Sequence, residues 1–158
     1  MKNKLLGLDV LVLEVDRLRK QEKKIVSTSG CFDILHAGHV AYLEEAKAKG
    51  DVLIVFLNSD SSVKRLKGEQ RPIVPENERA MVIAGLEAVD YVCIFHEQTP
   101  CSVIEKIKPD IVIKGGDYSG KIIPEMDVVN TYGGRVEYVS MTQGCSSTNI
   151  IEKIKRGI

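Results

Sequence analysis

Two histidines three positions apart stand in the stretch GCFDILHAGH, residues 30–39. An apolar, strand-like run precedes the stretch and a helical pattern follows it, so His36 and His39 are expected on the same side of a first helical turn. Gly38 has no side chain and leaves the helix N-terminus open to a phosphate. Free N–H groups at a helix N-terminus favour an anion, and two imidazoles add donors. The stretch therefore predicts a site that stabilises charge developing on a phosphate.

A zinc site and a pair of surface histidines are the alternative interpretations of His36 and His39. Zinc in proteins needs at least three protein ligands. The remaining histidine, His96, is expected at the end of another strand, and no cysteine is spaced to complete a zinc site. We therefore favour phosphate binding.

The size, charge and cysteines of the chain limit its partners and location. A chain of 158 residues can form one domain with a core. Lys+Arg and Asp+Glu are both 22, so bulk charge does not predict nucleic-acid binding. No apolar run approaches the roughly 20 residues needed to cross a bilayer, so we expect no membrane insertion. Without a secretory signal, reduced thiols in the cytoplasm are expected for Cys31, Cys93, Cys101 and Cys145. Cys31 and Cys145 are interpreted as small packing residues.

Short apolar runs alternate with helical patterns along most of the chain. Strands are expected at residues 25–30, 52–58, 91–95, 110–115 and 135–140. Helices are expected at residues 38–49, 60–67, 76–88, 100–108, 122–132 and 146–156. Continuously apolar strands favour a parallel sheet that is covered on both faces. The order predicts an α/β fold, a single Rossmann-like doubly wound domain with a five-stranded parallel sheet.

The N-terminal segment differs from the rest of the chain. Apolar residues recur with helical spacing between Leu5 and Leu18, with charged residues between them. Residues 1–23 are therefore predicted to form an amphipathic helix, and residues 24–158 the α/β domain. We expect this helix to pack on the domain or on a second subunit, which favours a homodimer.

Polar, glycine-rich residues follow four of the predicted strands. In doubly wound sheets, ligands bind at the carboxyl ends of the strands. A charged stretch with two prolines, residues 67–77, has the composition of a mobile loop over such a site. The residues expected to cluster there are Gly30, Asp33, His36, His39, Asn58, Asp60, Lys114, Gly115, Gly116, Asp117 and residues 142–149.

The chain also resembles a known superfamily. HxGH at the start of a first helix, preceded by GxFD, resembles the nucleotidyltransferases that include the cytidylyltransferases. The runs NSDSSVKRLKG, RPIVPENERA, VDYV, KPDIVIKGGDY and GCSSTNIIEKI resemble the adenylyltransferases that make ADP-heptose. This resemblance spans residues 24–155. It implies an enzyme that joins ATP, with Mg²⁺, to heptose 1-phosphate and releases pyrophosphate, for surface-glycan (lipopolysaccharide) precursors.

The resemblance also implies roles for individual residues. The expected catalytic residues on the phosphates are His36, His39, Lys67 and Arg79. The expected nucleotide contacts are Gly30, Cys31, Phe32, Asp33, Gly38, Lys114, Gly115, Asp117, Ser146, Ser147 and Thr148. Further substrate contacts are expected from Asn58, Asp60, Arg71 and Tyr118. The loop around Lys114 is expected at the base or at the sugar phosphate, and Asp33 orients the first histidine or organises the ligand.

Structural roles are alternatives for several of these residues. Helix capping is the alternative for Asp33, Asp60, Ser146, Ser147 and Thr148. Lys64 competes with Lys67 for the phosphates, and Arg79 has an ion pair with Glu76 as its alternative. Because the phosphate of a sugar phosphate is ionised near pH 7, the reaction needs positioning and charge stabilisation but no general base.

The chain departs from the family pattern at a few positions. Ser29 replaces the usual Asn before the GCFD motif, and Ser147 replaces a Thr; both keep hydrogen-bonding ability. Met141 stands where cytidylyltransferases have an Arg, which argues against the glycerol-phosphate cytidylyltransferase branch. Two other functions stay open: a nucleotidyltransferase that uses CTP, GTP or another acceptor, and a nucleotide sensor without turnover.

Overall fold

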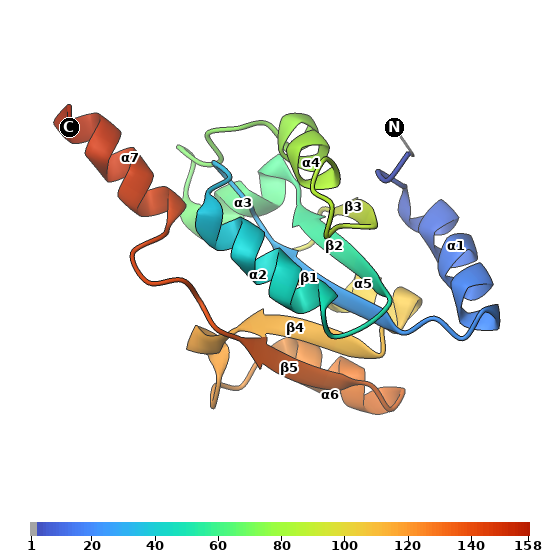
Figure 1. Cartoon of the computed structure of the whole chain (residues 1–158). Helices are drawn as coiled ribbons and strands as arrows, with labels where there is room; N and C mark the ends of the chain where they lie inside the picture. Colours follow the sequence, from blue (N-terminus) through green and yellow to red (C-terminus); the bar gives the residue numbers. More distant parts are fainter. Residues whose placement is uncertain (1–2) are drawn as a thin grey trace.

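The computed structural model describes residues 3–158, and its centre is one parallel sheet (Figure 1). The strands are β1 (Ile25–Gly30), β2 (Val52–Asn58), β3 (Tyr91–Phe95), β4 (Ile111–Gly115) and β5 (Arg135–Val139). Their spatial order is β3-β2-β1-β4-β5, and every pair is parallel. This confirms the predicted five-stranded α/β fold.

Helices connect the strands and cover both faces of the sheet. They are α1 (Leu8–Lys20), α2 (Ala37–Lys47), α3 (Asp60–Lys67), α4 (Glu76–Ala84), α5 (Cys101–Ile107), α6 (Pro124–Thr131) and α7 (Ser147–Arg156), with a 3₁₀ turn, η1 (Gly116–Tyr118). The predicted helix at 76–88 ends four residues early, at Gly85, a residue that weakens a helix. No helix within residues 3–158 is long and apolar enough to cross a membrane.

Alternating side chains of the strands fill two separate cores. Val26, Val55 and Ile113 pack in one core with α2 and α4, and we call this side of the sheet the α2 face. Their neighbours Ile25 and Val112 pack in the other core with α1, α5 and α6, which we call the α5/α6 face. Since successive side chains point to opposite faces, burial of both explains the unbroken apolar runs.

The N-terminal segment packs on its own domain. Leu11, Val15 and Leu18 of α1 are buried in the core of the α5/α6 face. Before α1, the Leu6 N–H donates to the carbonyl of Val92 in β3 over 3.0 Å, so the segment covers an edge strand. The helix predicted over residues 1–23 thus begins at Leu8. Residues 1 and 2 of the predicted range lie outside the described part of the chain.

The C-terminal helix, in contrast, projects from the domain (Figure 1). No residue of α7 is buried. Its apolar residues fall at helical spacing, and Ile154 is 70% exposed. The helix begins beside the sheet edge where the polar segments gather, so its N-terminus is the part that contributes to a site.

Candidate functional site

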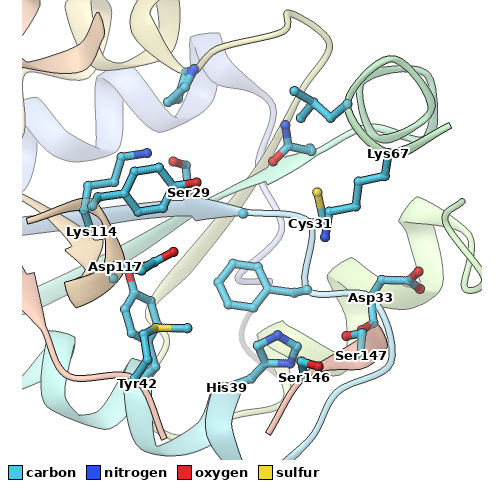
Figure 2. A pocket seen from close by; sticks show the side chains of 18 of the residues that line it. Ser29, Cys31, Asp33, His39, Tyr42, Lys67, Lys114, Asp117, Ser146 and Ser147 are labelled. Atoms are coloured by element: carbon cyan, nitrogen blue, oxygen red, sulfur yellow. The ribbon is translucent and has the colours of Figure 1, made fainter. Parts of the chain in front are cut away.

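A cavity of about 740 Å³ opens at the carboxyl ends of the strands (Figure 2). Sequence-predicted residues in its lining are Gly30, Cys31, Phe32, Asp33, His36, Gly38, His39, Asn58, Lys67, Lys114, Gly115, Asp117, Tyr118, Ser146, Ser147 and Thr148. The structure therefore brings together the segments after β1, β2, β4 and β5. The predicted residues outside the lining are Asp60, Arg71, Arg79 and Gly116, together with Gln143, Gly144 and Asn149 of the segment 142–149.

The two histidines of the HxGH stretch lie against each other in this cavity. His36 is the N-cap of α2, and His39 lies in its first turn. Their rings are stacked, with centroids 3.8 Å apart and an interplanar angle of 24°. The buried Nδ1 atoms of both rings have no hydrogen-bond partner within residues 3–158. Buried polar atoms are normally paired, so both rings keep hydrogen-bonding capacity for a ligand.

The environment of the two imidazoles keeps them neutral. Burial, with smaller effects of His36 and Lys67, lowers the pKa of His39 to about 4. Burial also lowers the pKa of His36. Both rings are therefore uncharged near pH 7 in the free protein, and a bound triphosphate would favour their protonated forms.

We expect the lowered pKa of His39 to make stability depend on pH. Between about pH 6.5 and about pH 4, the unfolded chain binds a proton at His39 and the folded chain does not, so the free energy of unfolding falls as the pH falls. His39→Asn removes this contribution. Urea unfolding at pH 7 and at pH 5 measures this change. The free energy of unfolding should fall more between pH 7 and pH 5 for the wild type than for the variant. Equal losses would contradict the neutral, buried imidazole.

Gly38 has a packing role that differs from the expected one. A Cβ atom at Gly38 would lie 2.8 Å from Cβ of Cys145 and 3.0 Å from Nδ1 of His36. The space that was expected to admit a phosphate is thus occupied by the segment before α7 and by the first histidine. Glycine is needed here for the close approach of those two groups, which fixes the position of the His36 ring.

The loop between β1 and α2 places an aromatic ring beside the histidines. Phe32 has a φ of +46° and Ile34 a φ of +52°, a region that non-glycine residues rarely adopt. The Phe32 ring lies 5.2 Å from the ring of His39. A Cβ atom at Gly30 would come within 2.9 Å of the Phe32 side chain, so Gly30 makes room for this ring.

Asp33 holds the loop after α3, and the hydrogen bonds of its carboxylate go to that loop and not to the histidine rings. Its carboxylate accepts hydrogen bonds from Nε of Arg71 and the N–H of Ile73, both at 2.9 Å, and from the N–H of Val74 at 3.0 Å. Burial acts to raise the pKa of Asp33, but these bonds hold it below its ordinary value. The predicted cap role is wrong, because His36 is the N-cap of α2. Arg71 is likewise engaged by Asp33, and the stretch predicted as a mobile loop is tied down.

Arg79 is the centre of a buried hydrogen-bond network. Arg79 is buried and only 2% exposed. The guanidinium donates to the carbonyls of Val74 (2.8 Å), Cys31 (2.6 Å) and Asn58 (2.9 Å) and to Oδ1 of Asp60 (2.8 Å). Arg79 thus joins the ends of β1 and β2 to the loop before α4, and its contact with the phosphates stays a prediction.

The polar residues at the two ends of α3 have different roles. Ser59 caps the helix, since its Oγ accepts from the N–H of Ser62, so the expected cap at Asp60 is corrected. Asp60 pairs instead with Arg79 and lies outside the cavity lining. At the other end, Lys67 lines the cavity and extends toward Cys31 (Figure 2). Lys67 is thus the lysine of α3 that reaches the site.

The thiol of Cys31 lies within the cavity lining. Burial raises the pKa of this thiol above its ordinary value, which disfavours the reactive thiolate. This agrees with the interpretation of Cys31 as a packing residue.

The start of α7 adds hydroxyl groups to the site. Oγ of Ser146 accepts from the N–H of Asn149 over 3.0 Å, so Ser146 is the cap among the three candidates. The Ser147 hydroxyl donates to the backbone carbonyl of Asp33. This bond attaches the start of α7 to the loop that carries His36, and it aims the helix N-terminus into the cavity.

The segment after β4 contributes charges. Nζ of Lys114 forms an ion pair with the carboxylate of Glu125 in α6 and lies 5.2 Å from the centre of the Tyr118 ring. A Cβ atom at Gly115 would lie 2.7 Å from Oδ1 of Asp117 and 2.8 Å from Sδ of Met141. Gly115 thus permits the close approach of these two side chains to the strand end.

Sequence reasoning missed several cavity residues. Gln98 and Thr99 follow β3 and could have been found by the rule that polar residues gather at strand ends. Tyr42 lies one turn after His39 on the same side of α2. The sequence gives no indication that Glu125 lines the cavity, because a glutamate in the first turn of a helix is common.

Known metal-binding arrangements are not found in the described chain. Residues 3–158 contain no group of three His, Cys, Asp or Glu side chains placed to hold a metal ion. The cavity instead presents imidazoles, a lysine, hydroxyls and a helix N-terminus. This set of donors suits phosphate oxygens.

Comparison with known proteins gives a consistent set of relatives. The cytidylyltransferase-like family matches residues 27–153. The bifunctional protein HldE of Geobacter metallireducens is 53% identical over 153 residues, which is 97% of this chain and 31% of that protein. HldE of Pseudomonas putida is 50% identical over 151 residues, 96% of this chain and 32% of that protein. This chain thus spans about a third of the length of these relatives.

A solved structure is also similar. The crystal structure of the lipopolysaccharide core biosynthesis protein from Thermoplasma volcanium superposes with a TM-score of 0.61 at 35% sequence identity. The match covers 76% of this chain and 97% of the Thermoplasma chain. The similarity therefore extends to both fold and sequence over about three quarters of this chain.

Proposed function

Since the chain belongs to the cytidylyltransferase-like family of nucleotidyltransferases, we propose that it joins ATP and a heptose 1-phosphate to give ADP-heptose and pyrophosphate. The runs that resemble ADP-heptose-forming adenylyltransferases support this choice of substrates. The name of the Thermoplasma protein, a lipopolysaccharide core biosynthesis protein, agrees with a role in surface-glycan precursor synthesis. The proposal concerns only the part of the bifunctional relatives that this chain matches, about a third of their length. It assigns no second activity to this chain.

The stacked histidine pair carries the proposal. A phosphate oxygen of the sugar phosphate forms a bond to the α-phosphorus of ATP, and the bond from that phosphorus to the bridging oxygen breaks as pyrophosphate leaves. His36 and His39 line the cavity, and their imidazoles would hydrogen-bond to the triphosphate oxygens. Lys67 reaches the same cavity and would neutralise the leaving pyrophosphate. The ionised nucleophile transfers no proton, so no residue acts as a base.

Magnesium is part of the proposed substrate complex. Mg²⁺ would neutralise phosphate charge in the complex with ATP. The donor chemistry of the cavity fits an ion that arrives on the triphosphate, because the cavity has donors for the phosphates while the Asp33 carboxylate is already used by three hydrogen bonds. No protein carboxylate is assigned to the metal.

A substrate panel tests the proposed function. Pyrophosphate release would be measured with ATP, CTP and GTP, each combined with heptose 1-phosphate, mannose 1-phosphate or glycerol 3-phosphate. We expect turnover with ATP and heptose 1-phosphate. Turnover with another pair would replace the substrates but keep the reaction, and nucleotide binding without any turnover would identify a sensor.

We also propose that the protein is cytoplasmic, where ATP is available to it. The distribution of a tagged chain between cell fractions tests this proposal.

A homodimer is proposed because α7 leaves an apolar face uncovered. Ile150, Ile151 and Ile154 recur at helical spacing and none of them is buried. The N-terminal helix, from which the dimer was first expected, is occupied by its own domain. Ile154→Asp should convert a dimer to a monomer in light scattering, whereas Glu152→Ala on the same helix should not. A wild-type monomer at micromolar concentration would contradict the dimer.

A further inference from the structure

The segment after β4 sends two charged side chains to different faces of the sheet. In β4, Val112 packs on the α5/α6 face and Ile113 on the α2 face. Alternation along the strand places Lys114 on the same face as Val112. Its ion-pair partner Glu125 lies in the first turn of α6, the helix that covers this face.

Asp117 lies on the other face. It is close to Tyr42 of α2 (Figure 2), whose hydroxyl hydrogen-bonds to Thr28 over 2.7 Å. Burial, and then the charge of Asp117, raises the pKa of Tyr42 to about 12. Asp117 is thus on the side of the cavity that holds the two histidines, while Lys114 lies beside Ser29 on the opposite side (Figure 2).

The α5/α6 side of the cavity is polar and holds the ion pair of Lys114 with Glu125. The exposed Lys121, whose Nζ lies 5.8 Å from the centre of the Tyr118 ring, adds a positive charge to the lining. The Lys114 and Glu125 side chains are only 12% and 4% exposed, so they neutralise each other in a largely dry position. Gln98 and Thr99, just before α5, line the same cavity. A neutralised lysine is a weak phosphate ligand, yet its N–H groups and the neighbouring carboxylate oxygens form adjacent donors and acceptors. Adjacent hydroxyl groups of a sugar present the complementary pattern.

We propose that Lys114 and Glu125 bind the hydroxyl groups of the acceptor sugar on the α5/α6 side of the sheet. This rests on the proposed function, which requires a sugar phosphate in the same cavity as ATP. The nucleophilic phosphate then lies above the end of β1, between the sugar and the histidine pair. Glu125 is assigned as a residue that determines acceptor specificity, and Lys114 is assigned to the sugar and not to the nucleotide.

The replacement Glu125→Gln tests this assignment. The variant keeps the shape of the side chain but removes the charge and one acceptor, so we expect KM for heptose 1-phosphate to rise ~10-fold or more while KM for ATP changes less than about twofold. A matched control is Asp90→Asn, which breaks the 2.5 Å ion pair of Asp90 with Lys47 outside the cavity. It should leave both KM values unchanged. Equal effects of Glu125→Gln on both substrates, or none, would overturn the assignment.

Deoxy acceptors separate recognition from a purely structural ion pair. A series of monodeoxy sugar 1-phosphates should contain at least one member that the wild type uses poorly and that Glu125→Gln discriminates against much less. A structural pair would leave the ratio between parent and deoxy acceptors unchanged for every member. If Glu125→Gln does not fold, the double replacement Lys114→Gln with Glu125→Gln, which leaves no unpaired charge, is measured in its place.

The same variants distinguish failure of the assignment from failure of the proposed function. If the wild type does not use ATP with heptose 1-phosphate, the proposed function fails whatever Glu125 does. The acceptor that the wild type does use is then tested with Glu125→Gln. A selective rise in KM for that acceptor supports the assignment to the α5/α6 side, and an unselective change overturns it.

Discussion

His39→Ala is expected to lower kcat by a factor on the order of 100 or more. The imidazole of His39 is stacked on His36, and its Nδ1 atom is buried without a protein partner. Removing the ring removes a donor from the place where charge on the phosphates grows, so the loss falls on the transition state. Pyrophosphate release at saturating ATP and heptose 1-phosphate measures kcat, and circular dichroism establishes that the variant is folded.

His96→Ala is the matched control for this prediction. His96 is exposed, follows β3 and lies outside the cavity lining, so its removal should leave kcat within about twofold. A folded His39→Ala variant whose kcat equals that of the control would show that the histidine pair takes no part in the chemistry.

Arg79→Ala is expected to destabilise the fold by about 3–5 kcal/mol, because it leaves a buried network without its centre. The change removes the hydrogen bonds to the carbonyls of Val74, Cys31 and Asn58. It also breaks the 2.8 Å ion pair with Asp60. For a chain of this size, such a loss lowers Tm by about 10 °C or more. Urea unfolding followed by far-UV circular dichroism measures the change.

Arg65→Ala provides the comparison for Arg79. Arg65 lies in α3 and donates to the carbonyl of His96, but Arg65 itself is exposed. We therefore expect Arg65→Ala to lower the free energy of unfolding by no more than about 1 kcal/mol. If Arg79→Ala were as stable as wild type and raised KM for ATP, Arg79 would be a phosphate ligand after all.

The sheet could be predicted closely from the sequence, and the reason is physical. β2 and β3 are largely buried on both faces and appear as apolar runs between polar segments. β1 is largely buried too, although it contains Ser27, Thr28 and Ser29, and the predicted bounds of all three strands agree with the structure. Helix ends were less accurate, as at α4, because Gly85 only weakens helix formation and gives no sharp stop signal.

The polar network behind the cavity could not be predicted in the same way. Asp33 and Arg79 have the side chains of phosphate-site residues and stand in the matching motifs, yet each is occupied by protein groups. Asp33 bonds to residues 38 to 41 positions away, and Arg79 bonds to the carbonyl of Cys31 48 positions away. Local sequence does not encode whether such a group meets a ligand or the backbone of another segment.

Glu125 illustrates a second limit of the sequence. Its partner Lys114 belongs to a strand and Glu125 to the next helix, so the pair exists only because α6 folds back on the α5/α6 face. Alternation along β4 shows that neighbouring side chains take opposite faces, but both faces are apolar. The face that receives Lys114 follows from the three-dimensional packing of the helices and not from the pattern of the strand.

The central claim is that His36, His39 and the N-terminus of α7 receive the triphosphate of ATP. A crystal structure with a non-hydrolysable ATP analogue and Mg²⁺ tests it most directly. We predict phosphate oxygens within hydrogen-bonding distance of both imidazoles and near the start of α7. Phosphates bound elsewhere, with both imidazoles still unpartnered or holding a metal ion, would contradict the account.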